Sequence, residues 1–506
     1  MVTLGSPTTF RSNTTGLDRA ASPLPPGIAG GFALALTVWV AWLLTHLPWM
    51  AQAFGISEQH AVPTILAAWF FASFLLGRSV GLRRAPLVGL IAGLVSALVG
   101  LLILGSRLTE IPVDAAASTS DPLIRSRLVP NAGLIALGFL GLGALIGTVG
   151  TLAGALTRPA GPRSEPNWLG RMALVTLLAA APLLFVGGLV TSTNSGMAVP
   201  DWPGTYGSNM FLYPLGPRFA ALEGKQPYAD IFLEHSHRLL GALLGLNALV
   251  LMVWTLMKEP RRWVKAWAAA TFLLICFQGL LGGLRVLEGS LDLAQDNVWL
   301  SAFHGVSAQV TFASIVALAM YLSTTYQSLN VANPAAPAHG NARLLKAMST
   351  GALHALWPQL IFGAMYRHAG STHALYTHMV FAFVVTTLAL VSGMIAISDT
   401  QAASNAASLE PSTTSASSPA PNSTARLWLA RLGYAVILCV AFQFLLGWAA
   451  FVTHSGREAA TIGEALVRTA HQANGAALLG LTTALALLAR QAWRAAGKPG
   501  RARREA

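Results

Sequence analysis

The chain has 506 residues, of which 54% are hydrophobic and only 10% charged, and its mean hydropathy is +0.57. Soluble proteins carry about 25% charged residues, so the composition excludes an ordinary soluble domain and predicts an all-α, polytopic membrane protein. The net charge of +13 does not indicate a nucleic-acid partner, because basic residues gather in the cytoplasmic loops of membrane proteins.

Long apolar segments predict about twelve transmembrane helices of roughly 18–24 residues each. The first segment is too long for the core of a signal peptide, so we interpret it as a retained helix. The predicted helices are 27–46, 63–79, 86–105 and 131–154, followed by 172–191, 234–257, 266–285, 299–322, 346–365, 374–396, 428–450 and 469–490.

The loops predict the orientation of these helices. Segments rich in Arg and Lys, such as "GRSVGLRR", "MKEPRRWVK" and the tail "RQAWRAAGKPGRARREA", fall on one side of successive helices. Such loops are typically cytoplasmic, so both termini are predicted to be cytoplasmic.

Polar segments divide the predicted helices into three groups. Residues 1–157 form an N-terminal four-helix extension of unknown role, and residues 169–325 and 344–492 form the two halves of an eight-helix core. The second half contains a Ser/Ala/Thr/Pro-rich segment, 398–426, which we expect to be a disordered cytoplasmic linker.

Similar motifs recur in the two halves of the core. The segment "CFQGLLGGLRV" (276–286) corresponds to "AFQFLLGWAAFV" (441–452), and "AFHGVSAQV" (302–310) corresponds to "TAHQANGAAL" (469–478). The core is therefore predicted to be two repeated four-helix bundles in a parallel arrangement.

Four histidines lie a few residues inside the second and fourth predicted helices of each half, namely His237, His304, His378 and His471. At a rise of about 1.5 Å per residue, the four imidazoles share one depth in the membrane. A single intramembrane histidine is often only an interhelical hydrogen-bond donor, and a proton relay is a further alternative. Two facing pairs in two similar halves favour two haem groups, each with two axial nitrogens. A zinc ion would need ligands that converge on one point.

In these residues the sequence resembles the haem A synthase family over about residues 171–490. The resemblance rests on "GGLVTSTNSGMAVPDWP" (187–203), on the Glu-x-x-His-Arg element of "EHSHRLLG" (234–241), and on His304, His378 and His471 in their segments. The Glu-x-x-His-Arg element is the most specific of these motifs.

The resemblance implies an enzyme that oxidises the C8 methyl group of haem O to a formyl group, giving haem A for terminal oxidases. It implies that His237 and His304 ligate the substrate haem, that His378 and His471 ligate a permanent haem b, and that Glu234 is the catalytic carboxylate. It further implies a bacterial plasma-membrane protein surrounded by lipid. Haem O would come from a haem O synthase, an electron donor of unknown identity would be needed, and a homo-oligomer is one option.

The residues beside the histidines agree with one reactive haem site in the first half and one electron-transfer site in the second. Glu234 shares a helix face with His237, whereas Leu375 precedes His378 by the same spacing and Met379 stands where the first half has Arg238. A plain salt bridge between Glu234 and Arg238 is the alternative to a catalytic role. For Arg238 we predict a haem propionate as partner, with a lipid headgroup as the alternative, and we interpret His235 as a bystander on the other side of the helix.

Two features depart from the family pattern. Many bacterial members carry a cysteine pair in the first outer loop, but the loop 192–233 has none, and Cys276 and Cys439 lie in apolar helices. The segment 201–215 is rich in Gly, Pro and aromatic residues and is either a lid over the substrate haem or an ordinary structured loop.

Two other functions remain open from the sequence. A di-haem b-type cytochrome would keep the four histidines but would have no use for Glu234. A transporter would share the number of helices and the repeat, but it would need polar groups near the membrane midplane, and the predicted core helices have few.

Overall fold

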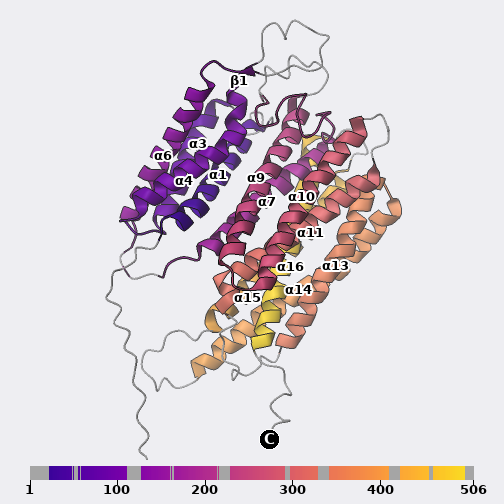
Figure 1. Cartoon of the computed structure of the whole chain (residues 1–506). Coiled ribbons are helices and arrows are strands. Elements are labelled where there is room, and N and C mark those ends of the chain that lie inside the picture. Colours follow the sequence, from indigo (N-terminus) through magenta and orange to yellow (C-terminus); the bar gives the residue numbers. More distant parts are fainter. Residues whose placement is uncertain are drawn as a thin grey trace, which may run out of the picture.

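The computed structural model is almost entirely helical (Figure 1). It describes residues 22–47, 49–50, 55–56, 58–110, 127–159, 161, 164–213, 215, 228–290, 297–328, 341–409, 422–454 and 460–495. All twelve predicted segments are helices, which confirms the all-α polytopic fold. Their bounds are α1 Leu24–His46, α3 Ala61–Gly77, α4 Ala85–Leu104, α6 Ala132–Leu156, α7 Trp168–Thr193, α9 Tyr228–Lys258, α10 Arg262–Ser290, α11 Val298–Leu322, α13 Ala342–Ala369, α14 Thr372–Leu409, α15 Asn422–Val452 and α16 Ile462–Ala495.

Within the described residues, ten of these helices are long and apolar enough to cross a membrane, and α3 and α13 are the two outside this group. Helix α3 has only 17 residues. Helix α13 carries Arg343, Lys346 and Arg367, which lower its hydropathy. The chain is therefore a multi-pass membrane protein whose helices satisfy their own backbone hydrogen bonds.

Short elements complete the described part of the chain. They are the 3-10 turns η1 (Glu58–His60) and η2 (Gly105–Arg107), the short helix α12 (Thr324–Ser328), and the strands β1 (Thr109–Glu110) and β2 (Arg127–Leu128). The two strands pair antiparallel, with Thr109 opposite Leu128. They lie between α4 and α6, at one end of the extension (Figure 1).

The extension packs through small residues. A Cβ atom on Gly93 would lie 2.0 Å from the carbonyl oxygen of Gly143, and one on Gly89 would lie 2.4 Å from that of Gly147. Such close approach of backbones, here between α4 and α6, is how membrane helices gain packing contacts without a hydrophobic driving force. The four helices α1, α3, α4 and α6 thus form a tight bundle beside the core (Figure 1).

The two halves of the core have the same order of neighbours. In the first half α7 contacts α9, α9 contacts α10, α10 contacts α11, and α11 returns to α7; α13, α14, α15 and α16 repeat this order. Helices α7 and α13 both end with a residue in the left-handed region, Asn194 (φ 59°) and Gly370 (φ 62°). The duplication itself stays a prediction.

Buried side chains connect the extension to the first half rather than separating the two. One hydrophobic cluster runs without a break from Trp39 and Trp42 of α1 to Leu189 of α7 and Leu243 of α9, whereas the second half has a cluster of its own around Leu356, Val436 and Leu485. The predicted domain boundary near residue 158 is thus crossed by a shared core.

The prediction of a disordered linker over 398–426 is wrong at both ends of this segment, which are helical. Helix α14 continues to Leu409 and α15 already begins at Asn422. The reason is composition, because "TQAASNAASL" (400–409) is rich in alanine, the strongest helix former. The remaining linker residues 410–421 lie outside the described residues, as do the ends of the chain at 1–21 and 496–506.

Candidate functional site

The four predicted histidines occupy corresponding helices of the two halves, with His237 on α9, His304 on α11, His378 on α14 and His471 on α16. All four side chains are half-buried. In the second half the imidazoles face each other, with ring centroids 6.2 Å apart and an interplanar angle of 73°. In the first half His304 lies within electrostatic range of His237.

A glycine on the preceding helix stands against each of these imidazoles. A Cβ atom would lie 2.8 Å from Cε1 of His237 if placed on Gly187, 3.7 Å from Cε1 of His304 on Gly282, 3.0 Å from Cε1 of His378 on Gly363, and 3.2 Å from Cε1 of His471 on Gly447. Larger residues at these positions would displace most of the rings. The four Gly–His pairs therefore hold the imidazoles at matching places between neighbouring helices.

The sequence carries a signal for these glycines that our interpretation missed. Three of them follow a glutamine at a spacing of four, in "QGLLG" (278–282), "QLIFG" (359–363) and "QFLLG" (443–447). On a helix this spacing places the glutamine and the glycine on one face. The corresponding segment of α7, "LLFVG" (183–187), has leucine in place of the glutamine.

These glutamines contact the fourth helix of the first half and the second and fourth helices of the second half. The side-chain nitrogen of Gln359 donates to the backbone oxygen of His378 at 3.0 Å, and that of Gln443 lies 3.2 Å from Nδ1 of His471. The side-chain nitrogen of Gln278 donates to the hydroxyl of Ser307, one turn beyond His304, at 2.9 Å. Polar side chains therefore lie at or near the depth of His304, His378 and His471 in otherwise apolar helices.

The tautomer of His378 follows from its hydrogen bond. Its Nδ1 lies 2.9 Å from the backbone oxygen of Gln359, and a carbonyl oxygen can only accept, so Nδ1 carries the proton. The lone pair then resides on Nε2, the form of a histidine that binds a metal. Clusters of three or more His, Cys, Asp or Glu side chains that could hold a metal ion are not found among the described residues. The chemistry of the donors is therefore that of two histidine pairs, with aromatic residues such as Phe362 and Phe381 nearby.

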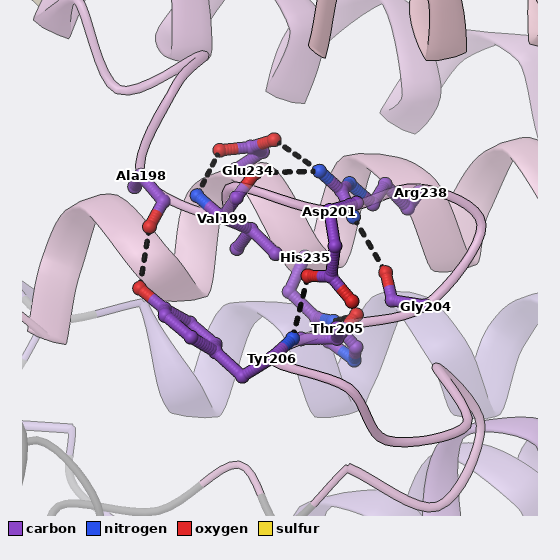
Figure 2. A network of polar contacts seen from close by, with 9 residues as sticks. All are labelled: Ala198, Val199, Asp201, Gly204, Thr205, Tyr206, Glu234, His235 and Arg238. Carbon is purple, nitrogen blue, oxygen red and sulfur yellow. Dashed lines mark hydrogen bonds and ion pairs between the residues drawn. The ribbon is translucent and has the colours of Figure 1, made fainter. Parts of the chain in front are cut away.

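Glu234 lies at the start of α9, one helical turn before His237, and is 4% exposed. Its Oε1 accepts from Arg238 at 2.6 Å, and its Oε2 accepts from the backbone N–H of Val199 at 2.8 Å (Figure 2). The predicted salt bridge with Arg238 is present, but it is buried, not exposed at a helix end. Breaking a buried pair costs far more than breaking a surface pair.

Arg238 fastens the loop 194–213 to α9. Its guanidinium donates to the backbone oxygens of Asp201 (2.7 Å), Gly204 (2.8 Å) and Val199 (3.1 Å) as well as to Glu234 (Figure 2). Both terminal nitrogens are engaged by the protein. A bidentate contact of Arg238 with a propionate, as predicted, would require one of these acceptors to give way, because it uses at least one terminal nitrogen.

His235 is not a bystander. It is 1% exposed, its Nδ1 lies 3.1 Å from the hydroxyl of Thr205, and its ring lies 5.2 Å from that of Tyr213. Side chains on two sides of α9 thus bind the same loop. Sequence spacing placed His235 away from His237 but could not show that a loop covers that side.

The loop is also braced internally. The carboxylate of Asp201 accepts from the backbone N–H groups of Tyr206 (2.6 Å) and Gly207 (2.9 Å), and the hydroxyl of Tyr206 donates to the oxygen of Ala198 (2.5 Å). The indole of Trp202 lies against Gly283 of α10, where a Cβ atom would approach it to 2.4 Å. Because Gly283 adjoins Gly282, which faces His304, the loop reaches the level of the first histidine pair. Residues 214 and 216–227 lie outside the described residues.

Among the described residues, the second half has no counterpart of the Glu234–Arg238–loop network beside His378. Leu375 and Met379 occupy the positions of Glu234 and Arg238, and α13 joins α14 through Gly370 and Ser371 alone. Two similar histidine pairs therefore have different surroundings. The first pair lies beside the buried carboxylate of Glu234 under a braced loop. The second pair contacts the amides of Gln359 and Gln443. The ion pair of Arg468 and Glu464 (3.7 Å) precedes His471 on the same helix.

Comparison with known proteins identifies related sequences. Residues 170–380 match the family described as "Cytochrome oxidase assembly protein". The chain is 27% identical over 195 residues to the heme A synthase of Exiguobacterium sibiricum, which covers 38% of this chain and 57% of that protein. It is 30% identical over 154 residues to the heme A synthase of Shouchella clausii, which covers 30% of this chain and 44% of that protein.

A mammalian protein is also similar to part of the chain. The heme A synthase COX15 of Mus musculus is 28% identical over 174 residues, which covers 30% of this chain and 42% of that protein. The chain thus spans about half the length of the curated relatives it matches. Glu234, His237, His304 and His378 fall within residues 170–380, whereas His471 and the extension fall outside them.

Proposed function

We propose that the chain is a haem A synthase, which oxidises the C8 methyl group of haem O to a formyl group; the match of residues 170–380 and the similarity to heme A synthases support this. The observation that carries the proposal is the difference between the two histidine pairs. Among the described residues, only the first pair has a buried carboxylate one helical turn away, Glu234, and a braced loop above it. The buried Glu464 of the second half lies about two turns before His471 and pairs with Arg468. A site for chemistry needs groups like those of the first pair, whereas a site for electron transfer needs only ligands and apolar walls.

In this proposal His237 and His304 hold the substrate haem O, and His378 and His471 hold a resident haem b. The residues fit these groups because each imidazole stands against a glycine and the lone pair of His378 resides on Nε2, where its contact in the structure is a long one of 3.4 Å to the Gln359 amide. A haem b in the second half would supply one-electron transfer. The remaining work falls to side chains of the first half.

Glu234 is proposed to manage the proton that leaves the reacting methyl group. Conversion of a methyl to a formyl group is a four-electron oxidation. Two hydroxylations, each taking one oxygen atom from an external oxygen-atom donor, give a geminal diol, which loses one water to leave the formyl group. A proton acceptor near that carbon lowers the barrier of these steps. A buried carboxylate also stabilises positive charge that develops nearby, because the low local dielectric strengthens the interaction. Arg238 and Val199 hold this carboxylate in place from the other side.

The loop 194–213 is proposed to exclude water from the first histidine pair. Trp202, packed on Gly283, and Val199, bonded to Glu234, place loop atoms over α9 and α10. Water in the site would screen the carboxylate and compete for the reacting carbon. The proposed location is the bacterial plasma membrane, with both termini cytoplasmic and this loop on the opposite side.

The test is the identity of the haem bound to the full-length protein purified from cells that make haem O. Pyridine haemochrome spectra and the mass of the extracted haem distinguish the candidate functions. Haem O or haem A beside haem B supports the synthase. Haem B alone would support a di-haem cytochrome, and a protein without haem would support a transporter.

A reporter fusion tests the orientation. A reporter that is active only in the periplasm, fused after Arg494, is expected to be silent, while the same reporter inserted after Gly207 in the loop is expected to be active. The opposite pattern would place the histidines near the other membrane surface and contradict the proposed topology.

A further inference from the structure

We propose that the N-terminal extension is a positioning element for the loop 194–213, and through it for Glu234. The role of this loop as a cover for the substrate rests on the proposed function, but the mechanical link does not. The extension would hold the loop in place from the side that α9 does not reach.

The end of the extension touches the loop directly. The hydroxyl of Thr109 in β1 donates to the backbone oxygen of Leu212 at 2.7 Å. Gly105 of η2 lies so close to the loop that a Cβ atom there would be 2.0 Å from the backbone oxygen of Phe211. Two adjacent peptide groups of the loop are thus held by two residues of the extension.

Tyr213, the next residue of the loop, packs against α9. Tyr213 is 1% exposed, and its ring packs on His235, 5.2 Å between centroids. His235 adjoins Glu234 in the chain, and the same loop donates the Val199 N–H to that carboxylate. The segment 211–213 therefore lies between the extension and the helix turn that carries Glu234.

A second contact supports the start of α9 itself. Trp42 of α1 packs on Phe232, with ring centroids 5.5 Å apart, and Phe232 is fully buried two residues before Glu234. His46 stacks on the other side of Trp42 at 5.3 Å. The shared hydrophobic cluster of the extension and the first half makes this contact rigid, because close-packed interiors transmit displacement.

The extension contacts the loop 194–213 and the start of α9 through α1, η2 and β1, and α6 lies on its other side. Helix α6, on the far side of the bundle, exposes large apolar residues such as Leu134, Leu137 and Leu145, as expected of a lipid-facing surface. The positioning role therefore belongs to α1, η2 and β1. It needs no additional partner.

The experiment is hydrogen–deuterium exchange of the full-length protein in lipid nanodiscs. The variant is Gly105→Val, and its control is Gly138→Val in α6, where a side chain would meet nothing within 4 Å. The backbone of Gly105 has φ −52° and ψ −33°, which any residue adopts, so the effect of Gly105→Val comes from its contact with Phe211.

We expect Gly105→Val to speed exchange of the protected amides of Val199, Tyr206 and Gly207 by about tenfold or more, through local opening of the loop. Exchange in α14 serves as an internal reference and is expected to stay unchanged. Gly138→Val is expected to leave both regions as in the wild type.

A milder variant decides the question if Gly105→Val fails to fold. Thr109→Val removes only the hydroxyl that binds Leu212, and Thr148→Val, which removes a hydroxyl bonded within its own helix, is the control. Loop exchange that is unchanged in Thr109→Val, or equally raised by Thr148→Val, would overturn the proposal. The measurement needs no haem turnover, so a failure of the proposed function would appear separately, as wild-type protein without haem O or haem A.

Discussion

The two halves of the core differ less in their histidines than in what surrounds them. Each half places two imidazoles on its second and fourth helices, each against a glycine of the preceding helix. The first half adds a buried ion pair, a braced loop and a core shared with the extension. Within the described residues, the second half has only a longer ion pair, Arg468–Glu464 at 3.7 Å, before His471, and it has neither a braced loop nor a core shared with the extension. Similar frameworks can thus carry different chemistry when only one turn of helix and one loop change.

The largest expected effect tests the second half. His378→Ala is expected to abolish the low-spin b-type spectrum of the purified protein, because a bis-histidine haem loses one of its two axial ligands. The matched control is His373→Ala, an exposed histidine on the same helix, which is expected to leave the spectrum intact. Full haem B content in His378→Ala would show that the resident haem is not held there.

The next prediction tests what is special to the first half. Glu234→Gln is expected to lower turnover of haem O by about 10²–10⁴-fold, the usual contribution of a general acid–base or charge-stabilising group, while both haem sites stay filled. Haem O or a hydroxylated intermediate would then accumulate, which mass spectrometry of the extracted haem detects.

Because Glu234 also anchors the loop, the control must loosen the loop without removing the carboxylate. Tyr206→Phe deletes the hydroxyl that donates to Ala198 and is expected to keep turnover within about tenfold of the wild type. Equal losses in Glu234→Gln and Tyr206→Phe would reduce Glu234 to an anchor of the loop.

A smaller effect is expected from the glycines, and it is graded within the first half. Gly187→Ala would place a Cβ atom 2.8 Å from the His237 ring, whereas Gly282→Ala would place one at an ordinary 3.7 Å from His304. Overpacking costs about 1–3 kcal/mol, so Gly187→Ala is expected to lower occupancy of the substrate site by about tenfold and Gly282→Ala to change it little. Titration of the purified variants with haem, followed by absorbance, measures both. Identical affinities would mean that the rings have room to move.

The sequence predicted the helices well because each long apolar run has one stable structure in a membrane. It also predicted Glu234 and the four histidines as candidate site residues, since ionisable groups in such helices are rare. It could not predict that Val199 donates to Glu234 or that Thr109 binds Leu212, because these contacts join segments far apart in the chain. The alanine-rich start of the linker was misread because serine and proline in the whole segment outweighed its local helix propensity.

The smallest effect concerns the attachment of the extension, which only the first half possesses. Arg84, just before α4, donates to both carboxylate oxygens of Glu165 (3.2 and 2.7 Å), and Trp168 at the start of α7 donates to one of them (2.9 Å). The hydrogen bond from Arg84 lowers the pKa of Glu165 from its usual value of 4.5. Its stabilising contribution is therefore complete above pH 4.5 and is lost as the pH falls through the lower value in the folded protein.

A double-mutant cycle with Arg84→Ala and Glu165→Gln measures this contribution by thermal unfolding in detergent. The side chain of Glu165 is 44% exposed, so the coupling is expected to stay below about 1 kcal/mol at pH 7 and to be lost as the pH falls below the usual pKa of 4.5. The second half serves as the comparison, because its hydrophobic cluster includes no residue of the extension. Loss of the Arg84–Glu165 pair should therefore speed amide exchange at the start of α7 and leave that of α13 unchanged. Equal changes in both helices would mean that the extension stabilises the whole core, and the contrast between the halves would then be confined to Glu234 and its loop.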